Sequence, residues 1–168
     1  MADDQRFFFL NLTQAGVKGG SQKVGHSDWL ELDNWDFSMN QTADPNVKGG
    51  RPTKTSATGR FGFSIKHNGP QMFKLCASGQ YINTPVTFEA ERAGLQSAGA
   101  QSSTMVYFQL VFNRVVVSHR GLSGDDGQKV EHIELVFERV DMMYKQVVNG
   151  MLGSAIAKSY DAKANRVT

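Results

Sequence analysis

The chain has 168 residues and a mass of 18.5 kDa, which is room for one domain. Hydrophobic residues make up 40% and charged residues 20% of the sequence, the usage of an ordinary globular protein, which argues against a disordered chain. Eighteen basic and 16 acidic residues give a net charge of +2, too balanced for a protein that neutralises a run of nucleic-acid phosphates. The single cysteine, Cys76, excludes an internal disulfide and an all-cysteine metal site.

From its N-terminal sequence we expect neither an export signal nor a membrane segment. Acidic residues precede the apolar run 7–10, which is far too short for the core of a signal peptide. No stretch approaches the roughly 18 consecutive apolar residues of a membrane helix. We therefore expect a chain that is made and folded in the cytosol and inserts into no membrane. If it is exported, it leaves without a signal peptide.

The first predicted strand, residues 28–40, changes the phase of its apolar alternation. Leu30 and Leu32 set one phase, and Trp35, Phe37 and Met39 take the other. A one-residue change of phase is typical of a β-bulge, which lets one long strand bend while each half still points its apolar side inward. The alternative is a loop between two short strands.

Residues 41–58 form a long polar loop without an aromatic residue, and loops of this length in compact domains usually have a function. The loop begins a basic stretch, because residues 41–80 contain six basic and one acidic residue, whereas residues 1–40 contain three and six. It is either a solvated loop or a charged surface that meets an acidic surface on another copy.

A strand and a short helix follow the loop. Apolar and small or polar residues alternate over residues 61–66, which predicts a strand. Residues 69–78 are predicted to form a helix, because Pro70 suits its first turn and Gly79 suits a left-handed C-terminal cap. The apolar face of this helix is expected to contain Met72, Phe73, Cys76 and Ala77.

The later strands repeat the pattern of the first. Residues 86–91 alternate regularly, and residues 104–118 and 131–145 each change phase once. Three bent strands in one small domain predict two sheets that share strands at corners, or a closed barrel. From residue 148 the pattern decays, so we assign residues 1–147 to a β-barrel domain and residues 148–168 to a C-terminal tail of the same domain.

No motif for catalysis or cofactor binding is found. Phosphate-binding, dinucleotide-binding and nucleophile-elbow motifs are absent from the sequence, and its four histidines lack metal-ligand spacing. The acidic pair Glu89 and Glu91 lies opposite an apolar face, which predicts a solvated surface. We therefore predict no enzymatic activity, no cofactor, no metal and no nucleic-acid partner.

The order and spacing of these elements resemble the Hcp proteins, the tube-forming subunits of bacterial type VI secretion systems. Residues 25–32 (GHSDWLEL), running into residues 34–38 (NWDFS), are similar to the second strand of that family. The resemblance covers about residues 6–165 and is also found in residues 61–66, 69–80, 87–94, 107–118 and 159–165.

The resemblance implies a mainly β fold, a two-sheet β-barrel with one short flanking helix and a long extended loop. It further implies that six copies close into a ring and that rings stack into a tube, which a contractile sheath propels with a spike protein at its tip. Effectors can be carried in the lumen. The implied partners are therefore other copies of the chain, the spike, the sheath and secreted effectors, and the protein is secreted by this route.

The resemblance also implies two sets of site residues. The loop is expected to contact neighbouring subunits through Asp44, Asn46, Lys48, Arg51 and Lys54, against acidic partners at Asp28 and Glu31 and also Asp33. The second strand is expected to face the lumen with Asp33, Asp36 and Ser38. Two alternatives remain, a tail-tube subunit of a phage or related contractile injection system, and a monomeric ligand-binding β-barrel.

Overall fold

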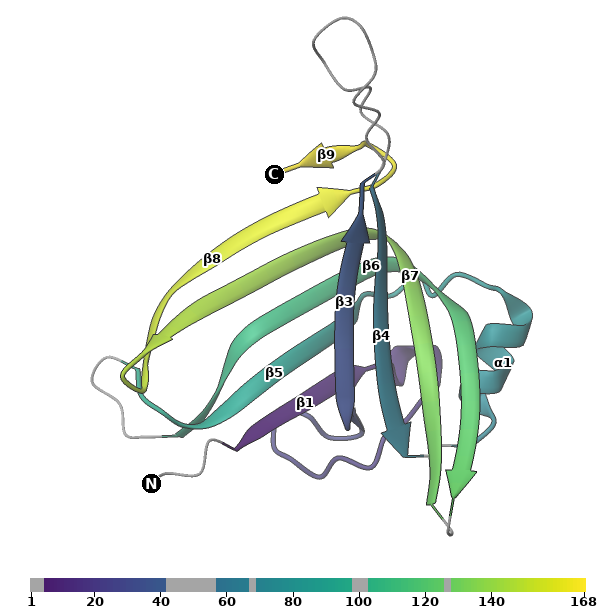
Figure 1. Ribbon diagram of the computed structural model, residues 1–168, viewed down its shortest axis with the longest axis horizontal. Coiled ribbons are helices and arrows are strands. Elements are labelled where there is room, and N and C mark those ends of the chain that lie inside the picture. The colour runs from purple at the N-terminus through teal and green to yellow at the C-terminus, as the bar shows by residue number, and fades with distance from the viewer. Residues whose placement is uncertain (1–4, 42–56, 67–68, 98–102, 126–127) are drawn as a thin grey trace, which may run out of the picture.

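The computed structural model describes residues 5–41, 57–66, 69–97, 103–125 and 128–168. They form strands with one α-helix and one short 3-10 helix, which confirms the mainly β class predicted from the sequence (Figure 1). In chain order the elements are β1 (Arg6–Asn11), η1 (Thr13–Ala15), β2 (Leu30–Glu31), β3 (Asn34–Asn40), β4 (Thr58–Lys66), α1 (Gln71–Ser78), β5 (Val86–Leu95), β6 (Ser103–Asp125), β7 (Gln128–Val148), β8 (Met151–Asp161) and β9 (Arg166–Val167).

The strands form one nine-stranded sheet with the order β2-β1-β5-β6-β7-β4-β3, and β8 and β9 extend it beside β7. The end strands β2 and β3 are consecutive in the chain, with Leu32 and Asp33 between them. The Leu32 amide donates to the carbonyl of Phe8 on β1, and the Asp33 amide donates to that of Ser64 on β4, both at 2.9 Å. The sheet therefore rolls up until its ends meet at these two residues, although β2 and β3 do not pair and the ladder is not closed.

The interior of the rolled sheet is an aromatic core. Phe61 on β4, Phe88 on β5 and Phe112 on β6 are fully buried. Trp35 on β3 bridges the two ends of the sheet, because its ring lies 4.7 Å from Phe88 and 6.0 Å from Phe8 on β1. Strands that are far apart in the ladder thus share one core, which a flat sheet could not achieve.

The predicted changes of phase have two different structural causes. β6 and β7 are unbroken strands of 23 and 21 residues, so the prediction of long single strands holds for them. The predicted position of the bulge is wrong, because their pairing keeps its register across the phase changes and shifts only between Val117 and His119. In β6 the buried phase changes between Phe112 and Val115, where Arg114 adopts a left-handed φ of 52°. In residues 28–40 the bulge prediction is wrong, because the chain leaves β1 after β2 and begins a new strand, β3, against β4.

Helix α1 ends at the predicted residue, but the side of the helix that packs against the core differs from the predicted one. Gly79 has a left-handed φ of 60°, and its amide donates to the carbonyl of Cys76. Met72 is buried, and Leu75 and half-buried Cys76 pack beside it against the core. Phe73 is 59% exposed, so the predicted face with Phe73 and Ala77 is wrong. The residues that pack follow i, i+3 and i+4 spacing, which one helix face can bury.

The C-terminal region forms strands in place of the predicted tail. The 11 residues of β8 pair antiparallel with β7, from Arg139 opposite Asp161 to Val148 opposite Met151 (Figure 1). The prediction of decaying structure after residue 148 is therefore wrong for this segment. β8 is rich in small residues and mostly exposed, so its sequence lacks the apolar alternation on which the prediction relied.

Replacing Phe88 by Ala removes a fully buried ring that contacts Phe61 and Trp35. We expect Phe88→Ala to lower the free energy of unfolding by about 3–5 kcal/mol, measured by urea denaturation. Phe73→Ala is the matched control, because it deletes the same ring from an exposed position and should cost less than about 1 kcal/mol. Equal losses in the two variants would contradict the assigned core.

Candidate functional site

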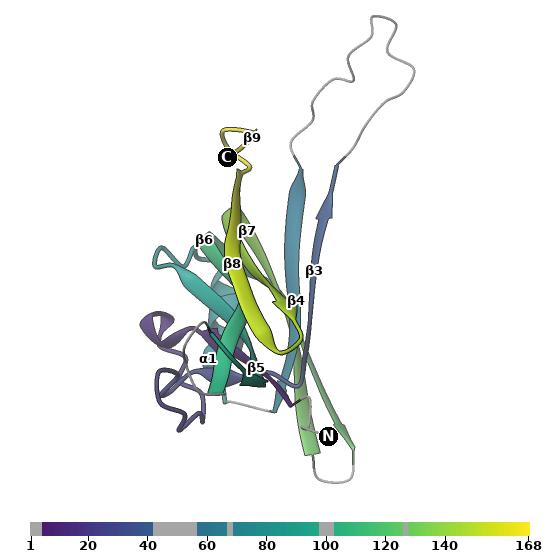
Figure 2. The ribbon, with the colours of Figure 1, turned by 90° about the vertical axis from the view of Figure 1, so that its left-hand side faces the viewer.

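The loop residues predicted to contact neighbouring copies, Asp44, Asn46, Lys48, Arg51 and Lys54, lie outside the described residues. The strands on either side of the loop are described. β3 pairs with β4 along its whole length, from Asn34 opposite Ser64 to Asn40 opposite Thr58. In Figure 2 the two strands run side by side toward one end of the molecule, so the segment 42–56 begins and ends at that place.

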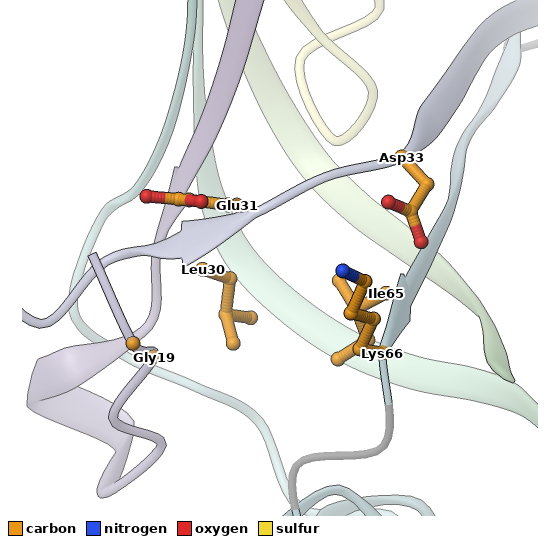
Figure 3. A pocket seen from close by; sticks show the side chains of 7 residues that line it. Gly19, Leu30, Glu31, Asp33, Ile65 and Lys66 are labelled. Carbon is orange, nitrogen blue, oxygen red and sulfur yellow. The ribbon is translucent and has the colours of Figure 1, made fainter. Parts of the chain in front are cut away.

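A hollow of about 300 Å³ lies where the sheet ends meet (Figure 3). Its lining comes from three parts of the chain, namely the residues before β2, the β2–β3 step and the end of β4. The lining residues are Gly19, Gly20, Leu30, Glu31, Asp33, Ile65 and Lys66. Two of them are acidic and one is basic, so the hollow has an excess of one negative charge.

Glu31 and Asp33 are exposed at this hollow, and within the described ranges neither carboxylate has an ion-pair partner. Asp28, the third predicted acidic partner, is nearby but differs in its environment. Its carboxylate lies 3.7 Å from Lys18 Nζ, and both side chains are more than half exposed. Its backbone carbonyl accepts a hydrogen bond from Gly19, a residue that lines the hollow.

The predicted lumen residues divide between two places. Asp36 and Ser38 lie on the face of β3 opposite the core, because Trp35 and Phe37 point inward. Asp33 lies apart from them and lines the hollow. The structure therefore brings Asp36 and Ser38 together and groups Asp33 with Glu31.

Asp36 belongs to a polar surface that extends across β3, β4 and β7. Arg60 on β4 lies 3.5 Å from the Asp36 carboxylate and 2.7 Å from Glu134 on β7. Next to this chain of charges, the hydroxyl of Ser64 and Nδ1 of His132 are 2.6 Å apart. Arg60, Glu134 and His132 were not predicted, because their neighbourhood depends on the pairing of β4 with both β3 and β7.

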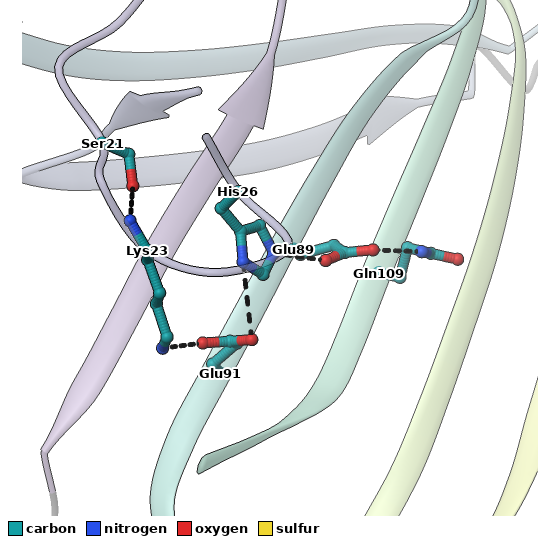
Figure 4. Close-up of polar contacts among 6 residues, drawn as sticks. All are labelled: Ser21, Lys23, His26, Glu89, Glu91 and Gln109. Atoms are coloured by element: carbon teal, nitrogen blue, oxygen red, sulfur yellow. Dashed lines mark hydrogen bonds and ion pairs between the residues drawn. The ribbon is translucent and has the colours of Figure 1, made fainter. Parts of the chain in front are cut away.

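A buried polar cluster lies on the outer face of β1 and β5 (Figure 4). Glu91 is only 6% exposed, so the predicted solvated surface at Glu89 and Glu91 is wrong. Residues 17–29, which we call the strap, cover both carboxylates. From the strap, His26 Nε2 lies 2.7 Å from Glu89, and Lys23 forms an ion pair with Glu91.

The described part of the chain contains no helix long and apolar enough to cross a membrane. A comparison with curated protein sequences gave no match. Solved structures, in contrast, align with nearly the whole chain.

One similar structure is Hcp1 from Salmonella typhimurium, with 25% sequence identity, a TM-score of 0.71, and coverage of 97% of this chain and 99% of that one. Another, described as a type six secretion system protein, has 16% identity and a TM-score of 0.79 over 98% of this chain and 100% of its own. A type VI secretion system effector from Yersinia pestis has 18% identity and a TM-score of 0.57, covering 94% and 99%. The last two likenesses show the fold alone.

The family model described as "Type VI secretion system effector, Hcp" matches residues 9–144, from β1 into β7. The match covers most of the sequence, including the hollow and the polar surface. It confirms the resemblance drawn from the residues: the chain belongs to the Hcp family of type VI secretion system proteins.

Proposed function

We propose that the protein is the subunit of the inner tube of a type VI secretion system, with hexameric rings that stack into the tube. The observation that supports this most directly is the pair of exposed carboxylates, Glu31 and Asp33, at the hollow where the sheet ends meet. They have no ion-pair partner within the described ranges, while the segment 42–56 supplies Lys48, Arg51 and Lys54.

Complementary charges at two different places on one chain suit a head-to-tail contact between copies. A ring uses two distinct surfaces on every subunit, and it closes when each copy is rotated by the same angle relative to the last. The acidic hollow and the basic segment are such a pair. In this proposal the segment 42–56 of one copy reaches the Glu31 and Asp33 carboxylates of the next, and Asp28 at the edge of the same region contributes to its negative potential.

The polar surface around Asp36 and Ser38 is proposed to face the lumen. Its charges are paired within the subunit, Asp36 and Glu134 both against Arg60, and a surface of this kind stays hydrated beside a passing protein. The tube then acts as a conduit for effectors, with a spike protein at its tip and a contractile sheath around it. The subunit performs no chemistry, and it leaves the cell as part of the tube.

The first prediction concerns the hollow. Glu31→Gln with Asp33→Asn removes both charges while conserving side-chain shape. We expect the double variant to keep the wild-type free energy of unfolding within about 0.5 kcal/mol, because exposed carboxylates without partners add little stability. Sedimentation velocity should show that copies associate at least about tenfold more weakly and that rings are lost, since about 1.4 kcal/mol per contact corresponds to a factor of ten in its association constant.

Asp36→Asn is the matched control for this experiment, because it removes one exposed carboxylate of β3 outside the hollow. This variant should still form rings. An unchanged ring population in the Glu31 and Asp33 double variant would contradict the assignment of the hollow as an interface.

The second prediction concerns the loop. Deletion of residues 43–56 removes the basic side chains and leaves the β3–β4 pairing, which ends at Asn40 and Thr58, intact. We expect a folded monomer with wild-type circular dichroism that no longer closes rings in electron micrographs. Rings of normal diameter after the deletion would rule out the loop as the assembly contact.

The third prediction concerns the lumen. In a Cys76→Ala background, Asp36→Cys should react readily with a bulky maleimide in the loop-deleted monomer, because the side chain is exposed there. In assembled tubes the same cysteine should be shielded, with labelling slowed about tenfold or more, since a bulky reagent must enter through the tube ends. Equal labelling rates in the two states would place Asp36 outside the lumen.

A further inference from the structure

A charged contact holds the strap on the sheet, and the sequence alone does not predict this contact. Phe7 and Phe9 lie on the outer face of β1, opposite Glu91 and Glu89 in the register of β5. Although it points away from the core, Phe9 is only 2% exposed, because the ring of His26 stacks on it with a centroid distance of 4.4 Å. His26 therefore lies at the centre of the contact between strap and sheet.

The groups around His26 include more acceptors than a neutral imidazole can satisfy. Its Nε2 lies 2.7 Å from one oxygen of Glu89, whose other oxygen accepts a hydrogen bond from Gln109 on β6. Its Nδ1 faces Glu91 at 3.8 Å and, among the residues that the structure describes, has no hydrogen-bond partner, although it is buried. The Trp29 ring of the strap lies edge-on to the imidazole at 4.6 Å. Lys23 lies on the other oxygen of Glu91 (Figure 4).

The charges balance only when the imidazole is protonated. Glu89 and Glu91 bring two negative charges into a largely buried site, and Lys23 brings one positive charge. A protonated His26 supplies the second positive charge and presents an N–H to each carboxylate. Without that proton, one buried negative charge is uncompensated and the lone pair of Nδ1 faces Glu91, an arrangement that destabilises a buried site.

We propose that His26 is a proton-dependent latch, which holds the strap on β1 and β5 while it is protonated and releases it when the proton is lost. Release changes the hollow as well, because Gly19 and Gly20 of the strap line it. Gly19 is packed so closely that a Cβ atom there would lie 1.9 Å from the Trp29 carbonyl oxygen. This extension of the latch to ring assembly rests on the proposed function, whereas the latch itself does not.

Hydrogen exchange of the full-length protein, read by mass spectrometry, tests the latch without reference to rings. The amides of Gly19, Ser21 and Asp28 are hydrogen-bonded within the strap. After correction for intrinsic exchange, we expect the protection of strap peptides to be about tenfold to a hundredfold lower at pH 8 than at pH 5.5, which is the loss expected when a charged hydrogen bond is broken. Peptides from β5 should keep their protection and serve as the internal reference.

In His26→Gln the substituted side chain cannot be protonated. We therefore expect the protection of strap peptides in this variant to be the same at pH 5.5 and pH 8. His119→Gln is the matched control, because His119 is exposed and outside the cluster, and it should retain the wild-type pH step. A wild-type strap whose protection does not change with pH, or an unchanged step in His26→Gln, would overturn the latch. The same comparison in the Glu31→Gln, Asp33→Asn double variant, which is expected to assemble less, separates the latch from ring formation, because a pH step that persists there belongs to the strap itself.

Discussion

The structure depends on the burial of a few aromatic rings between strands that are not hydrogen-bonded to one another. Trp35 on β3 contacts Phe8 on β1, Phe88 on β5 and Phe108 on β6, so the sheet must curl until its first and last strands face each other. The backbone completes this arrangement at Leu32 and Asp33, whose amides bond to opposite ends of the sheet. The sequence predicts a core enclosed between two sheets, and in the structure a single rolled sheet encloses it.

This geometry determines what lies on the surface. Because Trp35 and Phe37 point inward, Asp36 and Ser38 must point outward, beside Arg60 and Glu134. The step from β2 to β3 leaves Glu31 and Asp33 exposed at the hollow, and the same rolled shape carries β3 and β4 to the place where the segment 42–56 begins and ends. The acidic hollow is thus formed where the ends of the sheet meet, and the basic residues belong to the sequence between β3 and β4.

Much of the fold could be predicted from the sequence because period-two alternation and glycine caps are local signals. They identified the strands around Phe61 and Phe88 and the end of α1 at Gly79. The wrong face of α1 came from its residue spacing, whereas the other errors depended on which segments become neighbours. The sequence alone could not show that the chain changes partners after Leu32, that exposed β8 pairs with β7, or that the strap buries Glu91. The same holds for the candidate site, whose acidic side chains were identified from the sequence. The separation of Asp33 from Asp36 and the contact of Arg60 with carboxylates depend on the strand register. The contact of His26 with Glu89 depends on where the strap lies on the sheet.

The central claim is that copies of this chain close into rings through the acidic hollow and the basic loop. Negative-stain electron microscopy of the purified full-length protein at physiological salt tests it most directly. We expect ring-shaped particles with six-fold symmetry in class averages, some of them stacked. A field of single small particles at every protein concentration, with no rings or stacks, would contradict it.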